Sequence, residues 1–141
     1  MNTKTIKELN QFLEGNFMAI HAYENYIEHI DNAMMKQTLQ QLQQEHKQHA
    51  MLVAERIQNL GGVPVDDVGL RGNIAEIFIK LKGTTYDPIA IIKDAKVGEQ
   101  RGIDKSKQIL EGDLDKESLD LVQDILNKDT EHIERLDQLL H

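Results

Sequence analysis

The sequence contains no cysteine and no tryptophan, and aromatic residues make up only 4% of it. Without cysteine, disulfides, zinc ribbons, iron–sulfur clusters and thiol catalysis are excluded. With so few aromatic side chains, the stacking platforms that hold single-stranded nucleic acid are not expected. No apolar run approaches the roughly 20 residues that a membrane-spanning helix needs, and the first residues lack the apolar core of a signal peptide. These absences predict a cytoplasmic protein that has no membrane partner.

Positive charge is also scarce. The chain has 24 acidic and 16 basic side chains, giving a formal net charge of −8, and the basic residues are scattered along it. Nucleic-acid binding depends on clustered lysine and arginine, so no nucleic-acid partner is expected. An acidic surface can draw cations inward, although solubility explains the same composition. The length of 141 residues predicts one domain that covers residues 1–141.

Two pairs of polar residues repeat one spacing in the two halves of the chain. His46 and His49 are three positions apart, and so are Asp129 and His132. On a helix, residues three apart lie on one face, so the side chains of each pair can share a metal ion. The second pair follows the first at an offset of 83 residues. This repetition predicts two related helices whose polar faces point to the same region.

A second feature repeats with the same offset. Asn16 and Glu99 each lie 33 residues before the histidine that ends the pair in their half. Their surroundings also correspond, because residues 15–20 and 98–103 both begin with glycine and end with isoleucine. The chain therefore reads as a duplicated helix pair in which both halves aim metal-capable side chains at one interior point.

The hydrophobic periodicity predicts four helices. The first is expected to begin at a capping box formed by Thr5 and Glu8 and to end near residue 31, and the second to begin at a cap on Asn32 and to end at Gly61 and Gly62. The third is expected to begin at a cap on Asp87 and to end at Gly112, and the fourth to begin at a cap on Asp113 or Asp115. Each inner face is apolar apart from a few polar positions, which are Asn16, His46, His49, Glu99, Asp129 and His132.

A segment of different composition, residues 61–86, separates the second and third helices. It holds glycine, proline and aspartate around a short amphipathic stretch at residues 74–81. The second helix is roughly 40 Å long at 1.5 Å per residue, and about 26 connecting residues are enough to retrace that length. The sequence thus predicts an all-α, ferritin-like four-helix bundle, made of two antiparallel helix hairpins joined by one long crossover.

Three stretches of the chain resemble bacterioferritin and, more widely, the ferritin-like superfamily. They are residues 13–23 in the first helix, His49 with residues 54–57 and 60–64 in the second, and residues 125–136 in the fourth. The resemblance implies a di-iron carboxylate site at Asn16, His46, His49, Glu99, Asp129 and His132. Asn16 and His46 stand where the family carries glutamate, so the second half of the chain matches the motif more closely.

The resemblance also bears on haem and on assembly. The methionine that ligates haem in bacterioferritin falls at Lys47, so no haem is implied. The family's fifth short helix, which helps to build 24-subunit cages, has no counterpart before His141, so a homodimer or another small homo-oligomer is expected. Apolar residues of the first two helices that are expected to be exposed, such as Phe17, Ile27 and Met51, could supply a two-fold interface.

Two further side chains are candidates for the site. Glu45 is adjacent to His46, which places it about 100° around the helix, and it becomes a metal ligand if it turns inward. Tyr23 lies on the inner stripe of the first helix and is the candidate catalytic side chain, with a place in the core as the other interpretation.

A buried layer of polar side chains needs partners, because burying them unpaired would cost several kcal/mol. A metal ion is one solution, and a hydrogen-bonded polar layer is the other. Carboxylate and imidazole ligands suit iron, with manganese or zinc as alternatives. The sequence therefore predicts an iron-binding protein, a ferroxidase-type oxidoreductase that oxidises Fe(II) with oxygen or peroxide or protects against oxidative stress. Its centre is di-iron or mononuclear. The competing hypothesis is a ferritin-fold bundle without ferroxidase activity that acts as a structural or interaction protein.

Overall fold

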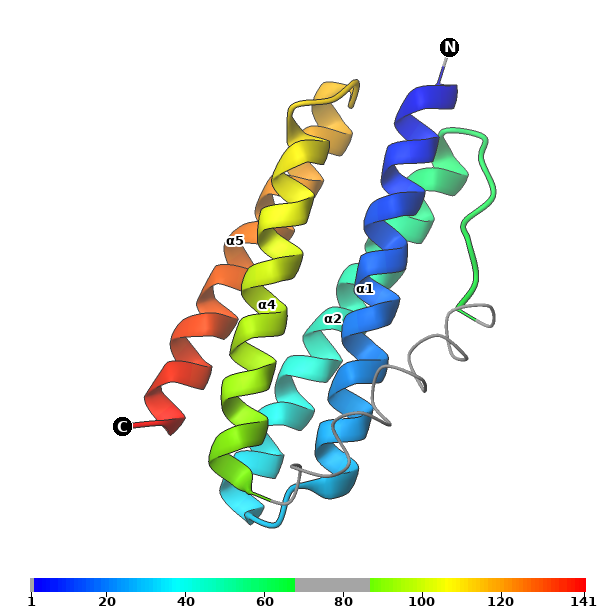
Figure 1. Ribbon diagram of the computed structural model, residues 1–141. Helices are drawn as coiled ribbons and strands as arrows, with labels where there is room; N and C mark the ends of the chain where they lie inside the picture. Colours follow the sequence, from blue (N-terminus) through cyan, green and yellow to red (C-terminus); the bar gives the residue numbers. More distant parts are fainter. Residues whose placement is uncertain (1, 68–86) are drawn as a thin grey trace.

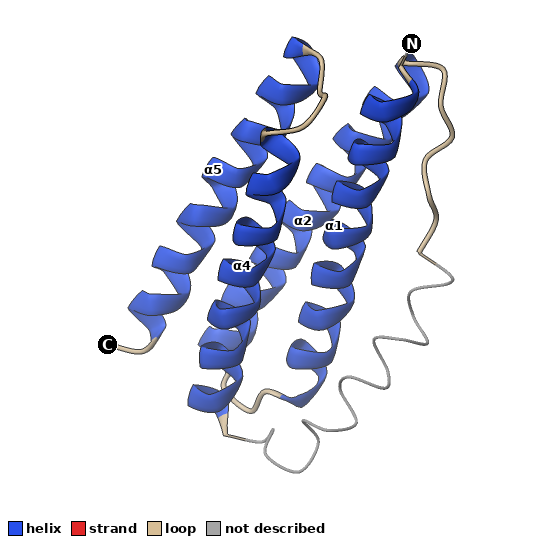
Figure 2. Ribbon diagram, turned by 45° about the horizontal axis from the view of Figure 1, so that its top comes forward, coloured by secondary structure: helices blue, strands red, loops and turns tan. Residues whose placement is uncertain are grey.

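Four long helices account for most of the described chain. The computed structural model describes residues 2–67 and 87–141, and its helices are α1 Thr3–His29, α2 Ala33–Asn59, α4 Pro88–Leu110 and α5 Lys116–Leu139 (Figure 1). Figure 2 shows helices and loops, and no strand, in these residues. The amphipathic stretch expected at residues 74–81 lies outside the described residues.

The helices form two hairpins that pack side by side. α1 packs against α2 and α4 packs against α5, while α1 also contacts α4 and α2 also contacts α5. The two helices of each hairpin run in opposite directions, whereas α2 and α4 run in the same direction (Figure 1). Since α2 ends at one end of the bundle and α4 begins at the other, the chain crosses the length of the bundle between them. The predicted ferritin-like bundle with one long crossover is confirmed.

Side-chain caps set the starts of three helices. The side chain of Asn32 accepts a hydrogen bond from the backbone N–H of Met35 at the start of α2. Asp87 caps α4 in the same way, ahead of a proline in the first turn. Asp115, and not Asp113, caps α5. Each cap satisfies one of the backbone N–H groups that a helix start leaves without an intrahelical partner.

The prediction for the start of α1 was wrong. The helix begins at Thr3, its N-cap residue Asn2 makes no side-chain capping bond, and it ends at His29, slightly before the expected position. The Thr5 hydroxyl donates to the carbonyl of Asp113 at 2.9 Å, and the Glu8 carboxylate accepts from the N–H of Asp113 at 3.0 Å. Both side chains therefore hydrogen-bond to the backbone of Asp113 in the α4–α5 loop instead of capping α1.

Glycine ends α2 as predicted. Gly61 has a φ of +87°, in the left-handed region where a side chain is strained. The N–H of Gly62 donates to the carbonyl of Ile57 at 2.9 Å, and the N–H of Gly61 donates to that of Gln58 at 3.0 Å. This pair of bonds is the Schellman motif, which satisfies carbonyls at a helix end.

A polar layer divides the core into two apolar clusters. One cluster lies toward the start of α1 and includes Leu13, Val53, Ile103 and Val122. The other lies toward the end of α1; its buried members are Tyr23, Tyr26, Ile30, Leu39, Leu42, Ile91, Ile92, Ala95 and Leu136. Along α2, α4 and α5, five buried residues with metal-capable side chains fall between the members of the two clusters; they are His46, His49, Glu99, Asp129 and His132. The apolar clusters above and below therefore fix the height at which the polar side chains meet.

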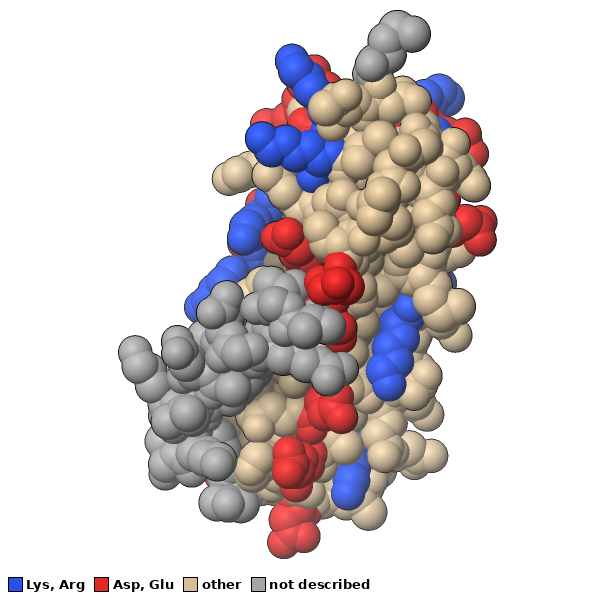
Figure 3. All heavy atoms as spheres, turned by 90° about the vertical axis from the view of Figure 1, so that its right-hand side faces the viewer, with Lys and Arg blue, Asp and Glu red and all other residues tan. Residues whose placement is uncertain are grey.

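The outer surface is mixed in character. On the face shown in Figure 3, acidic and basic side chains are interspersed with uncharged surface. Met51 is 71% exposed, as expected, but Phe17 and Ile27 are only half-buried residues that pack against the two apolar clusters. None of the described helices is both long and apolar enough to span a lipid bilayer.

Candidate metal centre

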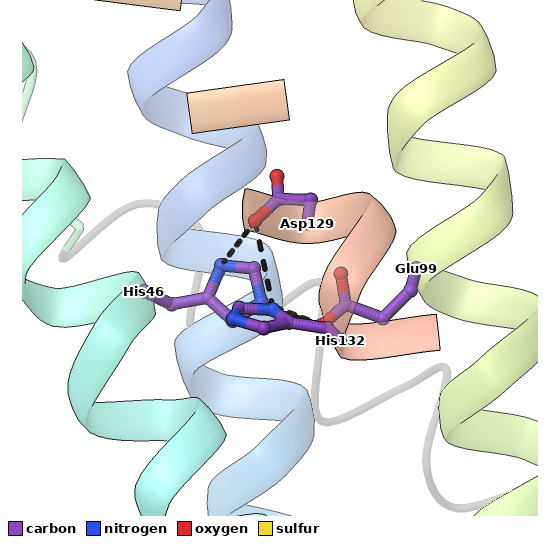
Figure 4. A group of neighbouring side chains, drawn as sticks. All are labelled: His46, Glu99, Asp129 and His132. Atoms are coloured by element: carbon purple, nitrogen blue, oxygen red, sulfur yellow. Dashed lines mark hydrogen bonds and ion pairs between the residues drawn. The ribbon is translucent and has the colours of Figure 1, made fainter. Parts of the chain in front are cut away.

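Three helices contribute the side chains of the polar layer. α2 provides His46 and His49, α4 provides Glu99, and α5 provides Asp129 and His132. The three-residue spacing places both members of each pair on the inner face of their helix. Ligand atoms of His46, Glu99, Asp129 and His132 all lie within 4.8 Å of one another. Figure 4 shows these four side chains converging from their helices.

Three histidines surround the Asp129 carboxylate. Its Oδ1 atom lies 3.9 Å from His46 Nδ1, 3.7 Å from His49 Nδ1 and 3.6 Å from His132 Nδ1. Among the described residues, Asp129 Oδ1, His46 Nδ1 and His49 Nδ1 are buried and have no hydrogen-bond partner. All three distances exceed the range of a hydrogen bond, so one oxygen and two nitrogens face each other unpaired.

The Glu99 carboxylate has a different environment. Its Oε1 atom accepts from the Tyr23 hydroxyl at 2.6 Å and lies 2.7 Å from His46 Nε2 and 3.2 Å from His132 Nδ1. The ring of His46 therefore stands between two carboxylates, with Glu99 at Nε2 and Asp129 at Nδ1. In contrast to Asp129 Oδ1, this oxygen is fully engaged by hydrogen bonds.

Glu45 turns inward, toward His132. Its Oε1 atom lies 3.2 Å from His132 Nε2, and its Oε2 atom accepts from Arg135 Nη1 at 2.9 Å. The other terminal nitrogen of Arg135 donates to the side-chain oxygen of Gln41 at 2.6 Å. The side chains of Glu45 and Arg135 are about one-third exposed, while that of His132 is 1% exposed. This chain of contacts joins the buried cluster to the surface between α2 and α5.

The two buried carboxylates differ in acidity. Burial alone would raise the pKa of Glu99, but the nearby charges and hydrogen bonds of His46 and His132 outweigh it and lower that pKa to about 2. Burial raises the pKa of Asp129 to about 6, because the histidine charges near it compensate only partly. Glu99 is therefore a stable anion at neutral pH, while an ionised Asp129 lacks sufficient stabilising contacts.

The pKa values of two histidines and the tyrosine are shifted in different directions. Burial, reinforced by the other two histidines, lowers the pKa of His49 to about 4, which leaves it neutral. Burial would also lower the pKa of His132, but its contacts with Glu99, Asp129 and Glu45 raise it above its ordinary value. Burial and the charge of Glu99 raise the pKa of Tyr23 well above its ordinary value, so its hydroxyl stays protonated and can donate.

The donors have the chemistry and spacing of a metal site. Two donors that are each about 2.1 Å from one ion lie roughly 3.0 Å apart at an angle of 90° and roughly 3.6 Å apart at 120°. The separations of 3.6–3.9 Å between Asp129 Oδ1 and the three histidine Nδ1 atoms are close to this range. Buried polar atoms are normally satisfied, so these unpaired atoms need a partner that binds lone pairs. A divalent cation is such a partner.

The structure brings together most, but not all, of the side chains that the sequence predicted for the site. His46, Glu99, Asp129 and His132 meet at one point, with His49 beside them. Glu45 reaches His132. The side-chain amide of Asn16 is buried, but it donates to the Phe12 carbonyl of its own helix at 3.0 Å. Its amide is thus engaged within α1 and is not hydrogen-bonded to the cluster.

Sequence reasoning missed Arg135 and Gln41. Arg135 follows His132 by three positions, so its place on the same face of α5 could have been noticed. Its partner Glu45 lies on α2, and nothing in the sequence aligns these two helices in height. The ion pair between Arg135 and Glu45 therefore became visible only in the folded bundle.

A family model described as a domain of unknown function, DUF2383, matches residues 4–112 of this chain. A search of curated proteins found no match.

Solved structures share the fold. A dodecameric thioferritin, the bacterioferritin-related protein from Bacteroides fragilis, is 22% identical with a TM-score of 0.78, over 96% of this chain and 83% of that one. A ferritin-like, diiron-carboxylate protein from Bacillus anthracis is 23% identical with a TM-score of 0.68, over 96% and 94%. A two-domain protein from Anabaena variabilis, with DJ-1/ThiJ/PfpI-like and ferritin-like domains, is 18% identical with a TM-score of 0.76, over 96% of this chain and 35% of that one. These likenesses confirm that the bundle is ferritin-like.

Proposed function

The chain belongs to the DUF2383 family, and we propose that it is a single ferritin-like domain, residues 1–141, that binds one divalent transition-metal ion in its polar layer. The metal is iron, and the function is the oxidation of Fe(II) by oxygen or peroxide. This reaction consumes Fe(II) and peroxide, which together cause oxidative damage. The side chains that surround the ion are His46, His49, Glu99, Asp129 and His132.

The observation that carries this proposal is the set of unpaired buried atoms. Asp129 Oδ1, His46 Nδ1 and His49 Nδ1 have no hydrogen-bond partner among the described residues, although each is removed from water. An unpaired buried polar group costs about 1–3 kcal/mol, and more when it is charged. Three such atoms at one point are explained together by one bound cation, whereas a metal-free polar layer would leave all three unexplained.

Iron is favoured by the ligand types and by the similar structures. Imidazole with carboxylate suits iron, manganese and zinc, and softer thiolate ligands are absent because the chain has no cysteine. The similar protein from Bacillus anthracis is described as a diiron-carboxylate protein. When bound, iron supplies the one-electron chemistry that no side chain of this protein can provide.

The protein's own side chains prepare the site for this chemistry. Glu99 remains anionic and contributes negative charge near a cation, because its pKa is lowered to about 2. Tyr23 keeps its proton and holds Glu99 through a 2.6 Å hydrogen bond, which is the role proposed for this candidate catalytic residue. The apolar clusters on both sides of the layer limit the access of water.

One metal ion is proposed because the side chains that would complete a second site are altered. Asn16 is neutral and bonded within its own helix. His46 stands in place of a carboxylate, and its ring fills the space between Glu99 and Asp129. The same alteration favours a second candidate function, which is a metal-binding ferritin-fold protein without ferroxidase activity.

Metal content and Fe(II) oxidation test the two functions together. Protein purified without added metal, and then loaded with Fe(II) under anaerobic conditions, should bind one equivalent per chain. Asp129→Asn should lose that equivalent, and Asp124→Asn, an exposed carboxylate of the same helix, should retain it. Exposure to oxygen or peroxide then separates the functions, because repeated turnover supports oxidation and binding without turnover supports the second function. No binding by the wild-type chain would refute both.

A further inference from the structure

The geometry points to a ligand set of three histidine Nδ1 atoms and one carboxylate oxygen, Asp129 Oδ1, with Glu99 and Glu45 as positioning residues that do not bind the metal. This inference rests on the proposed function and specifies its centre. In this centre Asp129 is the one carboxylate that binds the metal. Glu99 and Glu45 instead contact a histidine each, Glu99 at His46 and Glu45 at His132.

The ring of His46 shows which nitrogen is free to bind a metal. Its Nε2 atom lies 2.7 Å from Glu99 Oε1, which is a short hydrogen bond to a carboxylate. A carboxylate accepts hydrogen bonds, so Nε2 must carry the proton, and a protonated nitrogen cannot bind a metal. The Nδ1 atom keeps its lone pair, is buried without a hydrogen-bond partner, and faces Asp129 Oδ1.

His132, on α5, has a related arrangement that differs at Nδ1, which is hydrogen-bonded to Glu99 Oε1 at 3.2 Å. Its Nε2 atom faces Glu45 Oε1 at 3.2 Å, and its Nδ1 atom faces Asp129 Oδ1 at 3.6 Å. Glu45 is fixed in turn by the 2.9 Å bond from Arg135. A histidine that binds a metal through one nitrogen usually donates from the other nitrogen to a carboxylate, which sets the ring orientation. Both histidines are therefore held at Nε2 by a carboxylate; His46 Nδ1 is free, and His132 Nδ1 binds when the metal displaces its proton and the Glu99 contact.

Existing hydrogen bonds hold Glu99 in the positioning role. The same Oε1 atom accepts from the Tyr23 hydroxyl and from His46, so two donors already occupy its lone pairs. It is also 3.2 Å from His132 Nδ1. Binding of a metal at that nitrogen would replace this single contact and leave the other two unchanged. Asp129 Oδ1 has no such donor, and it is the carboxylate oxygen left free to bind.

His49 completes the set from the same face of α2. Its Nδ1 atom is 3.7 Å from Asp129 Oδ1 and has no hydrogen-bond partner among the described residues. The resulting centre has three neutral nitrogens and one anionic oxygen around a divalent cation. Glu99 offsets the remaining single positive charge from one ring away, and the charge of Glu45 is offset by Arg135.

Nuclear magnetic resonance of the zinc-loaded protein tests the assignment directly. Zn(II) is diamagnetic and accepts the same ligands, so ¹⁵N-labelled protein can be followed through the two- and three-bond ¹H–¹⁵N couplings of each imidazole. We expect one equivalent of Zn(II) to move the Nδ1 resonances of His46, His49 and His132 to metal-bound values. The Nε2 atoms of His46 and His132 should keep their protons. Binding of either ring through Nε2 overturns the inference.

Zinc affinity in variants gives a second, independent measurement. Glu45→Gln and Glu99→Gln keep an oxygen that can accept from the histidine, so each should still bind one equivalent, with affinity weakened about 10- to 100-fold. Asp129→Asn should lose high-affinity binding, and Glu55→Gln, an exposed glutamate of α2, should bind as the wild type does. Helicity measured by circular dichroism confirms that each variant folds.

The outcomes distinguish this inference from the proposed function. If Glu99→Gln abolishes zinc binding as completely as Asp129→Asn does, then Glu99 is a ligand and the inference is wrong, while the proposed metal centre stands. If the wild-type chain binds neither zinc nor iron, the proposed function itself fails. If Glu45→Gln binds zinc as tightly as the wild type, Glu45 has no positioning role.

Discussion

Asp129 Oδ1 and His49 Nδ1 lie 3.7 Å apart inside the bundle, and neither atom makes a hydrogen bond within the described part of the chain. Both groups have lost water without gaining a partner, a combination that destabilises a folded protein. The raised pKa of Asp129 and the lowered pKa of His49 have burial as their main cause. The metal-free protein is therefore expected to be strained at this point, in a way that a cation relieves.

Neutralising Asp129 should stabilise the metal-free protein. Burial raises the pKa of this group from its ordinary value of 3.8 to about 6, so the folded state holds its proton more tightly than the unfolded state does. The stabilisation from that proton is complete below about pH 4 and is lost as the pH rises through 6. One pKa unit corresponds to about 1.4 kcal/mol, so above pH 7 the free energy of unfolding of metal-free Asp129→Asn should exceed that of the wild type by up to about 3 kcal/mol.

Urea unfolding in the presence of a chelator measures this effect. The difference in the free energy of unfolding between Asp129→Asn and the wild type should be small near pH 4 and should grow up to about pH 7. The exposed variant Asp124→Asn serves as the control for replacing a carboxylate on α5. A difference that does not change with pH would contradict the explanation.

Metal addition should stabilise the wild type more than Asp129→Asn. A ligand that binds only the folded state at 100 times its Kd stabilises it by about 2.7 kcal/mol. Zn(II) or anaerobic Fe(II) should therefore raise the Tm of the wild type, while Asp129→Asn should show little change. Calorimetric scans with and without metal check this, and an equal rise in both proteins would place the binding site elsewhere.

Restoring carboxylates at the two altered positions should increase metal capacity. Asn16→Glu combined with His46→Glu adds two anions to the polar layer and removes the ring between Glu99 and Asp129. We expect metal stoichiometry to rise from one toward two per chain, and the rate of Fe(II) oxidation to increase. The single change Asn16→Glu is the control, because His46 still fills the centre. A double variant that binds no more metal than the wild type argues against this account.

A side chain at the first glycine of the turn after α2 should destabilise the protein. Gly61 has a φ of +87°, so Gly61→Ala should cost about 1–2 kcal/mol and lower the Tm by several degrees. Gly15 offers a matched control within α1, because a Cβ there meets no atom within 4 Å. Gly15→Ala should stabilise the protein by about 0.5–1 kcal/mol. Thermal unfolding measures the Tm of both variants. Equal Tm changes in Gly61→Ala and Gly15→Ala would contradict a special role for the left-handed conformation at Gly61.

The exposed apolar side chains of α2 should mediate self-association. Met51 is 71% exposed and Leu52 is 50% exposed, on neighbouring positions in the last third of the helix. We expect a dimer or another small oligomer by light scattering, and Met51→Glu should shift the mass toward the 16.1 kDa of one chain. Met34, which is 70% exposed at the start of α2, provides the control Met34→Glu. A monomeric wild type would rule this interface out.

The four helices and most of their limits could be predicted because the determinants are local. The apolar spacing, the caps at Asn32 and Asp87, and the glycines after α2 act within a few residues of where they stand. The same holds for the pairing of Asp129 with His132, since a three-residue spacing on a helix decides it. Thr5 and Glu8 were misread as a capping box because their partner, Asp113, is more than 100 residues away.

The sequence by itself determined which polar side chains face the interior, because helical periodicity assigns each to a face. Only the tertiary structure decided how they meet. The heights of α2, α4 and α5 relative to one another depend on the packing of the two apolar clusters. That packing places His46 between Glu99 and Asp129, joins Glu45 to Arg135, and leaves the Asn16 amide bonded within α1. Distances of this kind are set by contacts between helices, and no spacing along one chain encodes them.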